Sequence, residues 1–405
     1  MPDLSPGPWL RLTALAAVVA TGLVVASGEL GLAHRVLAIA ALAPLVTLVV
    51  AAWVAHRRLL RVTGAALGLF VAEIALGGLV SVSEASWLVS VHVGAAVLAF
   101  AASALAAAAV FRGGKRVPRG APRDYVTLTK PRIMSLLLLT GACGMFVGAG
   151  GVPPLGDLAV LLTGLALACG GASALNHMLD ADIDRLMGKR TQARPVAAGR
   201  VPPARALEFG LVLSAASFVL LASLSNVLTA LLALAGNLFY VLVYTRWLKR
   251  STPQNIVIGG AAGAVPPLVG WAAATGNLTL PALFLFLVVF VWTPPHFWAL
   301  ALLIRRDYEA AKVPMLPVVR GERETTRQIL LYSLGLVAVT LLPLTWSMFG
   351  LVYALAALAL GGAFVALAWR LRREATPRRA AVLFHYSLAY LALLFVAMAV
   401  DPLVA

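Results

Sequence analysis

Three oxygen-bearing side chains recur every four residues in the segment NHMLDADIDRLMGKRTQARP: Asn176, Asp180 and Asp184. On an α-helix this spacing places all three on one face. Carboxylate and amide oxygens suit Mg²⁺ that is also held by the phosphates of a substrate. Basic side chains that could bind those phosphates follow at once, namely Arg185, Lys189, Arg190 and Arg194. The segment therefore predicts a diphosphate site with Mg²⁺ on Asn176, Asp180 and Asp184.

Two further polar groups stand where apolar runs end. One is YTRWLKR, which offers Tyr244, Lys249 and Arg250 for substrate binding. The other is WTPPHFW with His296, followed by Asp307 in RRDY. We expect Pro294 and Pro295 to break or kink their helix and to free carbonyl groups, which a membrane protein tolerates only in a buried or wet site.

The composition sets the environment of these groups. The chain has 405 residues, of which 61% are hydrophobic. This is typical of a polytopic membrane protein. The net charge of +16 does not indicate a nucleic-acid partner, because the Lys and Arg residues fall in short blocks between apolar runs, as the positive-inside rule predicts.

Thirteen apolar runs are long enough to cross a bilayer as helices. Their expected limits are 9–28, 36–55, 63–82, 87–111, 133–150, 156–178, 204–223, 226–245, 255–274, 279–304, 328–348, 350–369 and 380–400. If they alternate in direction, the basic blocks all lie on one side, which is then the cytoplasm. This topology places the N-terminus and the predicted site on the cytoplasmic side. The lack of an Arg- and Ser-rich transit peptide favours a bacterial source and the cytoplasmic (inner) membrane.

The segment RGGKRVPRGAPRD, residues 112–124, is basic, rich in Gly and Pro, and without apolar period. It is typical of a linker. We therefore expect a four-helix transmembrane module at 1–111, a linker at 112–124 and a nine-helix catalytic domain at 125–405.

The nine-helix part resembles the UbiA-type superfamily of intramembrane prenyltransferases, and within it the branch that farnesylates haem. The matching passages, in order, are LTKPRIM with Lys130, NHMLDADIDRLMGKRTQARPVAAGR, YTRWLKR, GAVPPLVGW, WTPPHFWALA and DYEAAKVPMLPVV. The resemblance implies an all-α helical bundle around a cavity open to lipid. It also implies an Mg²⁺-dependent transfer of the farnesyl group of farnesyl diphosphate to a vinyl group of haem b. Water addition then gives haem O, which leads to haem A.

The same resemblance assigns roles to the candidate residues. It implies that Asn176, Asp180 and Asp184 bind the metal, and that His296 and Asp307 lie in the same site. Substrate contacts are expected from Lys130, Arg185, Lys189, Arg190, Arg194, Tyr244, Lys249 and Arg250. Most of the superfamily has a second Asp-rich motif, whereas this region offers only His296 and Asp307, which leaves the number of Mg²⁺ ions open.

The first four helices weakly resemble one half of haem A synthase, through AHR, AEIALGGLVS and SVHVGAAVLA. His34 and His92 are then candidate haem ligands, because both lie toward the external side of their helices. The module could hold a haem, or pair with haem A synthase or with a second copy of the chain. A helical anchor that binds nothing is an equal alternative.

Two other functions remain open at this point. One is a quinone-pathway aromatic prenyltransferase, which the PPHFWALA and VPMLPVV passages disfavour. The other is a non-enzymatic haem carrier or transporter, which would more often show internal repeats.

Overall fold

The computed structural model describes residues 8–26, 32–55, 59–80, 86–111, 120–346 and 348–404. All regular elements of these residues are helices, which confirms the all-α prediction. Ten of the described helices are long and apolar enough to span a membrane, so this is a multi-pass membrane protein. Three more helices contain shorter apolar stretches among their described residues. The count of thirteen spans therefore remains a prediction.

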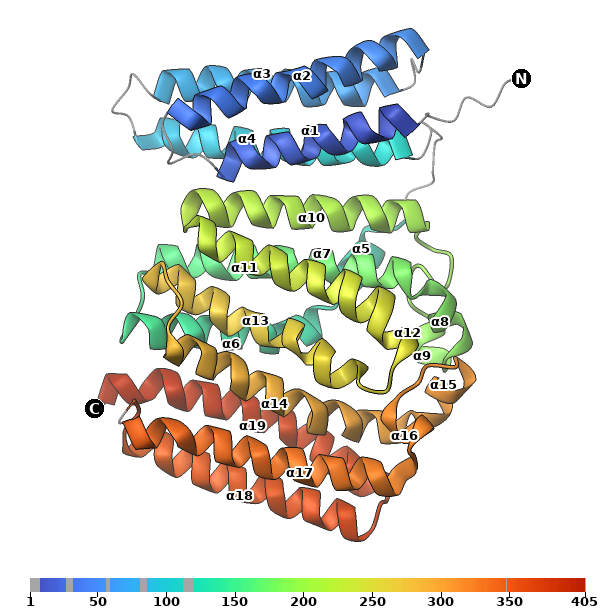
Figure 1. Cartoon of the computed structure of the whole chain (residues 1–405), viewed down its shortest axis with the longest axis vertical. Helices are drawn as coiled ribbons and strands as arrows, with labels where there is room; N and C mark the ends of the chain where they lie inside the picture. The colour runs from blue at the N-terminus through green and yellow to red at the C-terminus, as the bar shows by residue number, and fades with distance from the viewer. Residues whose placement is uncertain are drawn as a thin grey trace.

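The first four helices form a separate layer at one edge of the molecule (Figure 1). They are α1 (Pro8–Ala26), α2 (Leu32–Ala55), α3 (Leu60–Val80) and α4 (Ser86–Phe111). Apolar side chains, including Ala14, Leu45 and Phe70, pack into a core of their own. Among the described residues, α1 and α4 contact α10 of the remaining chain.

The remaining spans form the larger bundle (Figure 1). They are α6 (Pro131–Ala149), α7 (Leu155–Leu179), α10 (Pro203–Leu224), α11 (Val227–Leu238) continued by the π-helix η2 (Phe239–Leu248), α13 (Asn255–Thr275), α14 (Leu280–Leu303), α17 (Gly321–Leu341) continued by the 3₁₀-helix η3 (Leu342–Trp346), α18 (Leu351–Arg373) and α19 (Pro377–Val404). These are the nine spans expected of the catalytic domain. Helix α6 contacts both α13 and α19, so segments far apart in sequence meet around it.

Short helices gather at one end of this bundle (Figure 1). They are α8 (Ala181–Leu186), α9 (Lys189–Gln192), α12 (Lys249–Ser251), α15 (Arg305–Ala310) and α16 (Leu316–Val319), while α5 (Pro122–Leu128) precedes α6. Most of the predicted site residues lie on them or beside them. Helix α5 begins at Pro122, inside the predicted linker, and 112–119 lies outside the described residues, so the domain boundary stays a prediction.

The contact between α6 and α13 depends on glycine. A Cβ atom at Gly270 would lie 1.9 Å from the Gly141 carbonyl oxygen, and one at Gly144 would lie 2.4 Å from the Pro267 oxygen. The two backbones therefore touch directly, as small residues permit in membrane bundles.

The proline pairs do not interrupt their helices. Helix α14 continues through Pro294 and Pro295, and α13 continues through Pro266 and Pro267. The helix is therefore not broken at Pro294 and Pro295, while the alternative of a kink there stays a prediction. Packing of α14 against α13, α17 and α19 holds it in helical form, as neighbouring helices can do in membranes.

Candidate active site

The metal strip spans the junction of two helices. Helix α7 ends at Leu179, and Asp180 connects it to α8, which carries Asp184. Helical hydrogen bonds nevertheless continue through the junction, from Asp180 N to Asn176 O at 2.9 Å and from Asp184 N to Asp180 O at 2.8 Å. Asn176, Asp180 and Asp184 therefore keep the four-residue periodicity that the sequence predicts.

Both carboxylates of the strip are fully buried, and each is paired with a cation. Lys249 Nζ lies 2.5 Å from Asp180 Oδ2, and Arg194 Nη1 lies 2.7 Å from Asp184 Oδ1. Burial raises the pKa of Asp184, while the Arg194 guanidinium opposes this shift. Two predicted phosphate-binding cations thus lie on the strip itself.

Asn176 connects three elements. Its Oδ1 accepts a hydrogen bond from Lys130 Nζ at 2.8 Å, and its Nδ2 donates to Asp180 Oδ2 at 2.8 Å and to Thr245 Oγ1 at 3.1 Å. The amide oxygen that the sequence assigned to Mg²⁺ is therefore bound by an ammonium group here. Thr245, which is fully buried, was not predicted from the sequence because a threonine in an apolar helix carries no distinctive signal.

Lys130 occupies a strained position between α5 and α6. Its φ of 51° lies in the left-handed region, which is uncommon for a residue with a side chain and often marks a functional site. Ser173 Oγ donates to the Leu128 carbonyl at 2.6 Å, so that the end of α5 is tied to α7. Burial and the nearby Arg194 and Lys249 lower the pKa of Lys130 to about 7.

The π-helix η2 presents the YTRWLKR residues to the strip. In this geometry residues five apart lie on adjoining turns, as Tyr244 and Lys249 do. The Tyr244 ring stacks on Tyr240 with 5.5 Å between centroids and packs on Gly259 of α13. Single-turn π-bulges are often found at functional sites, and here the π-helical stretch covers ten residues. No local sequence signal predicted it.

Arg250 is held by a different aspartate. Its Nη1 and Nη2 donate to the two oxygens of Asp182 at 2.7 Å each, and Nη2 also donates to the Leu179 carbonyl. This pairing lowers the pKa of Asp182 to about 2. Arg250 comes no closer to Asp180 Oδ1 than 3.9 Å, so it lies at the rim of the strip.

Three other predicted cations point to solvent. Arg185, Lys189 and Arg190 are exposed, and Arg185 Nε donates to the Ala197 carbonyl at 3.1 Å. These positions are compatible with a wet site entrance, but they do not contact the strip.

Asp307 joins the site through a close backbone contact. A Cβ atom at Gly188 would lie 2.6 Å from Asp307 Oδ2, so only glycine allows the carboxylate to approach this loop. The neighbouring Tyr308 is buried, and its burial raises the pKa of the phenol. Asp307 therefore lies against Gly188, in the loop that follows the strip, and its role in the site stays a prediction.

His296 lies elsewhere in the bundle, between α14 and α19. Its Nδ1 is 2.6 Å from Ser387 Oγ, and its ring is stacked between Trp292 and Phe384. Among the contacts of the described residues, none joins His296 to the metal strip.

His177 was not among the residues predicted from the sequence. It follows Asn176, is 2% exposed, and neither ring nitrogen has a hydrogen-bond partner among the described residues. A histidine inside the motif could have been noticed as an unusual polar group at the end of an apolar helix.

The strip fits a shared Mg²⁺ site. Asp180 Oδ1 and Asp184 Oδ2 are buried and accept no hydrogen bond from any described residue. Mg²⁺ is usually held by one or two carboxylates together with phosphate oxygens. In the described part of the chain, no group of three or more His, Cys, Asp or Glu side chains is close enough to hold a metal. The two free oxygens therefore suit an ion that is completed by its substrate.

In the first module, His92 Nε2 lies 3.6 Å from Glu73 Oε1. The pair gives the buried Glu73 of α3 a partner on α4. The side chain of His34 lies outside the described residues, so a shared haem on His34 and His92 remains a prediction.

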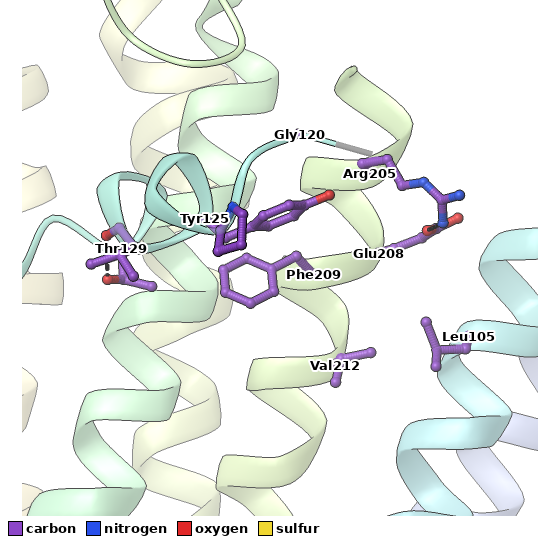
Figure 2. A pocket seen from close by; sticks show the side chains of 10 residues that line it. Leu105, Gly120, Tyr125, Thr129, Arg205, Glu208, Phe209 and Val212 are labelled. Atoms are coloured by element: carbon purple, nitrogen blue, oxygen red, sulfur yellow. Dashed lines mark hydrogen bonds and ion pairs between the residues drawn. The ribbon is translucent and has the colours of Figure 1, made fainter. Parts of the chain in front are cut away.

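A cavity of about 680 Å³ lies where α4 meets α5 and α10 (Figure 2). Its lining is mostly apolar and includes Leu105, Tyr125 and Phe209, with the Arg205–Glu208 ion pair at 2.7 Å at one side. None of its lining residues belongs to the predicted site.

Comparison with known proteins identifies relatives of the chain. The model of the UbiA prenyltransferase family matches residues 137–396. The protoheme IX farnesyltransferase of Symbiobacterium thermophilum is 57% identical over 281 residues, which cover 69% of this chain and 94% of the relative. A protein of the same name from Roseiflexus sp. is 52% identical over 282 residues, 70% of this chain but only 53% of that protein.

The fold has a counterpart among solved structures. A structure of digeranylgeranylglyceryl phosphate synthase superimposes with a TM-score of 0.59 at 17% identity and covers 70% of this chain and 99% of the other. Helices α1 to α4 lie outside the matched family region.

Proposed function

The chain belongs to the UbiA prenyltransferase family, and from this premise we propose that it transfers the farnesyl group of farnesyl diphosphate to a vinyl group of haem b. Water adds to the second vinyl carbon, and the products are haem O and diphosphate. The observation that carries the proposal is the pair of unpartnered oxygens on Asp180 and Asp184, flanked by cations. The names of the relatives support haem as the acceptor.

The cations of the strip would bind the leaving group. Lys130, Lys249 and Arg194 converge on Asn176, Asp180 and Asp184, and each can donate to a diphosphate oxygen. Asp180 and Asp184 would hold Mg²⁺, which would supply further neutralisation of the negative charge that develops on the diphosphate. Preorganised cations in a buried site stabilise this charge more strongly than water does.

Aromatic rings would shelter the allylic cation. Tyr240 and Tyr244 stack beside the strip, and the buried Tyr308 lies next to Asp307. Ring faces attract positive charge, and apolar walls limit premature attack by water. The π electrons of the haem vinyl group then form the new bond to C1 of the farnesyl group.

The surroundings of the reaction are part of the proposal. The basic blocks favour the cytoplasmic membrane of a bacterium, with the site facing the cytoplasm. Both substrates are lipophilic and could enter from the bilayer. A second copy of the chain, or haem A synthase, would receive the product.

The test is an assay of the purified full-length protein with haem b, farnesyl diphosphate and Mg²⁺. Mass spectrometry of the extracted haem should show one added farnesyl group and one added hydroxyl group, since the water loses a proton, and EDTA should abolish the product. No farnesylated haem, together with prenylation of 4-hydroxybenzoate, would overturn the proposal in favour of an aromatic prenyltransferase.

A further inference from the structure

The proton on the His296 imidazole is assigned by its neighbour. Ser387 Oγ donates its single proton to the Phe384 carbonyl at 2.7 Å. The same oxygen lies 2.6 Å from His296 Nδ1, so it must accept the proton of Nδ1. Nε2 is then the unprotonated nitrogen and carries a free lone pair.

The ring of His296 is also fixed in orientation. Trp292 stacks on it at 4.3 Å between centroids with 14° between planes, and Phe384 stacks at 4.9 Å with 22°. Trp292 is itself anchored, because its Nε1 donates to the Ser387 carbonyl at 2.8 Å. Ser387 of α19 thus contacts both the His296 ring and the Trp292 ring of α14.

The lone pair of Nε2 is available. Nε2 makes no hydrogen bond within the described part of the chain. It is also not fully enclosed by protein, whereas both ring nitrogens of His177 are. A neutral histidine whose other nitrogen donates to a fixed acceptor is the usual arrangement of a metal-binding imidazole. The rings of Trp292 and Phe384 cover both faces of the imidazole, so the direction of the Nε2 lone pair is fixed.

We propose that His296 Nε2 ligates the iron of the haem substrate, and that Ser387 is the positioning residue that fixes its tautomer. This inference rests on the proposed function, because it takes haem as the acceptor. His296 lies eight residues before Ile304, about 12 Å along α14 from the end where Asp307 meets Gly188. The vinyl groups lie at the rim of the porphyrin, so iron bound at His296 leaves that rim free to extend toward the diphosphate.

The experiment titrates the purified full-length protein with ferric haem b and with iron mesoporphyrin, whose ethyl groups cannot be farnesylated. Both should give a saturable histidine-ligated Soret band. His296→Ala should remove this band and weaken binding at least tenfold, and added imidazole should restore the band. Ser387→Ala should retain ligation but lower haem affinity about tenfold and shift the iron–histidine stretching frequency.

A matched variant serves as the control. His385→Ala changes an exposed histidine on the same helix as Ser387. It should not change the band. His296→Met, which keeps bulk and supplies a different ligand, should give an altered spectrum if the Ala variant does not fold.

The outcomes separate the two proposals. An unchanged spectrum and affinity in His296→Ala, or equally tight binding of iron-free protoporphyrin, overturns ligation even if haem is farnesylated. A His296-dependent spectrum without any farnesylated product overturns the proposed function but leaves ligation in place.

Discussion

At the scale of residues, the site consists of opposite charges that are buried together. Asp180 with Lys249 and Asp184 with Arg194 each use one carboxylate oxygen, and the second oxygen stays unpartnered. The cations compensate the desolvation of the carboxylates in the absence of ligand. The strip can therefore bind a metal and a diphosphate without first breaking these pairs.

Asp180→Asn should lower turnover by roughly a hundredfold or more, because the strip loses a charged metal ligand. It should also lower the unfolding temperature, since Lys249 remains buried without its partner, at a cost of about 3 kcal/mol. Turnover and thermal unfolding in detergent would measure both effects. The double variant Asp180→Asn/Lys249→Met should regain stability but not activity, and recovery of turnover would contradict this role.

Asp182→Asn should keep most of the activity. Asp182 is exposed and pairs with Arg250 at the rim, and exposed pairs contribute little to stability. Its pKa is lowered to about 2, so the pair is fully formed above the ordinary carboxyl range and is lost only as the pH falls toward 2. Activity and unfolding profiles between pH 5 and pH 9 should therefore match those of the unchanged protein; a loss equal to that of Asp180→Asn would refute this separation of roles.

At the scale of elements, irregular helices orient the polar groups. The junction at Asp180, the left-handed residue Lys130 and the π-helix η2 all meet at the strip. Two hydrogen bonds connect them, from Asn176 of α7 to Thr245 of η2 and from Lys249 of α12 to Asp180. These departures from regular helical geometry orient the polar side chains toward the strip.

Deletion of Leu242 should test the π-helix. This residue is 56% exposed on the lipid-facing surface, and its removal would allow η2 to become α-helical. Lys249 would then rotate by about 100° away from Asp180. We expect turnover to fall at least a hundredfold while membrane insertion persists. Leu242→Ala, which keeps the residue count, should remain active.

Gly270→Ala should destabilise the bundle, because its new methyl group would meet the Gly141 carbonyl at the contact of α6 and α13. Overpacking of this kind costs about 1–3 kcal/mol. Gly263→Ala on the same helix is the control, since nothing lies within 4 Å of the added atom. Thermal unfolding in detergent should separate the two variants, and equal unfolding temperatures would exclude a direct backbone contact.

At the scale of the whole molecule, the chain combines a family bundle with an additional layer of four helices. The additional layer has its own apolar core and contacts the bundle along α10, beside the cavity of Figure 2. The family match begins at residue 137, beyond this layer. Its predicted role in haem binding is therefore separate from farnesyl transfer.

Removal of residues 1–119 should leave the farnesyl transfer rate within about twofold, because every residue of the strip lies after the cut. Replacement of His92 by Ala in the full chain should likewise spare transfer, while it removes any haem bound to the first module. Turnover and the haem content of the purified proteins would be measured. A folded but inactive 120–405 fragment would show that the first module takes part in the reaction.

The sequence alone was sufficient for the membrane character, the all-α class and the Asn176, Asp180 and Asp184 strip. These follow from composition and from a four-residue period, which are local properties of the chain. The same is true of the cations Lys130, Arg194 and Lys249, which lie in recognisable motifs.

Only the tertiary structure decided which cation meets which acid. Lys249 pairs with Asp180 across 69 positions, and Arg250 pairs with Asp182 across 68. Such partners depend on how α7 and η2 pack, and one irregular turn changes which side chains face each other. Neighbouring helices likewise determine that α14 continues through Pro294 and Pro295. They also determine that Ser387 of α19 contacts His296. Local sequence patterns do not predict those neighbours, because the partners of a side chain depend on packing between segments that are distant in the sequence.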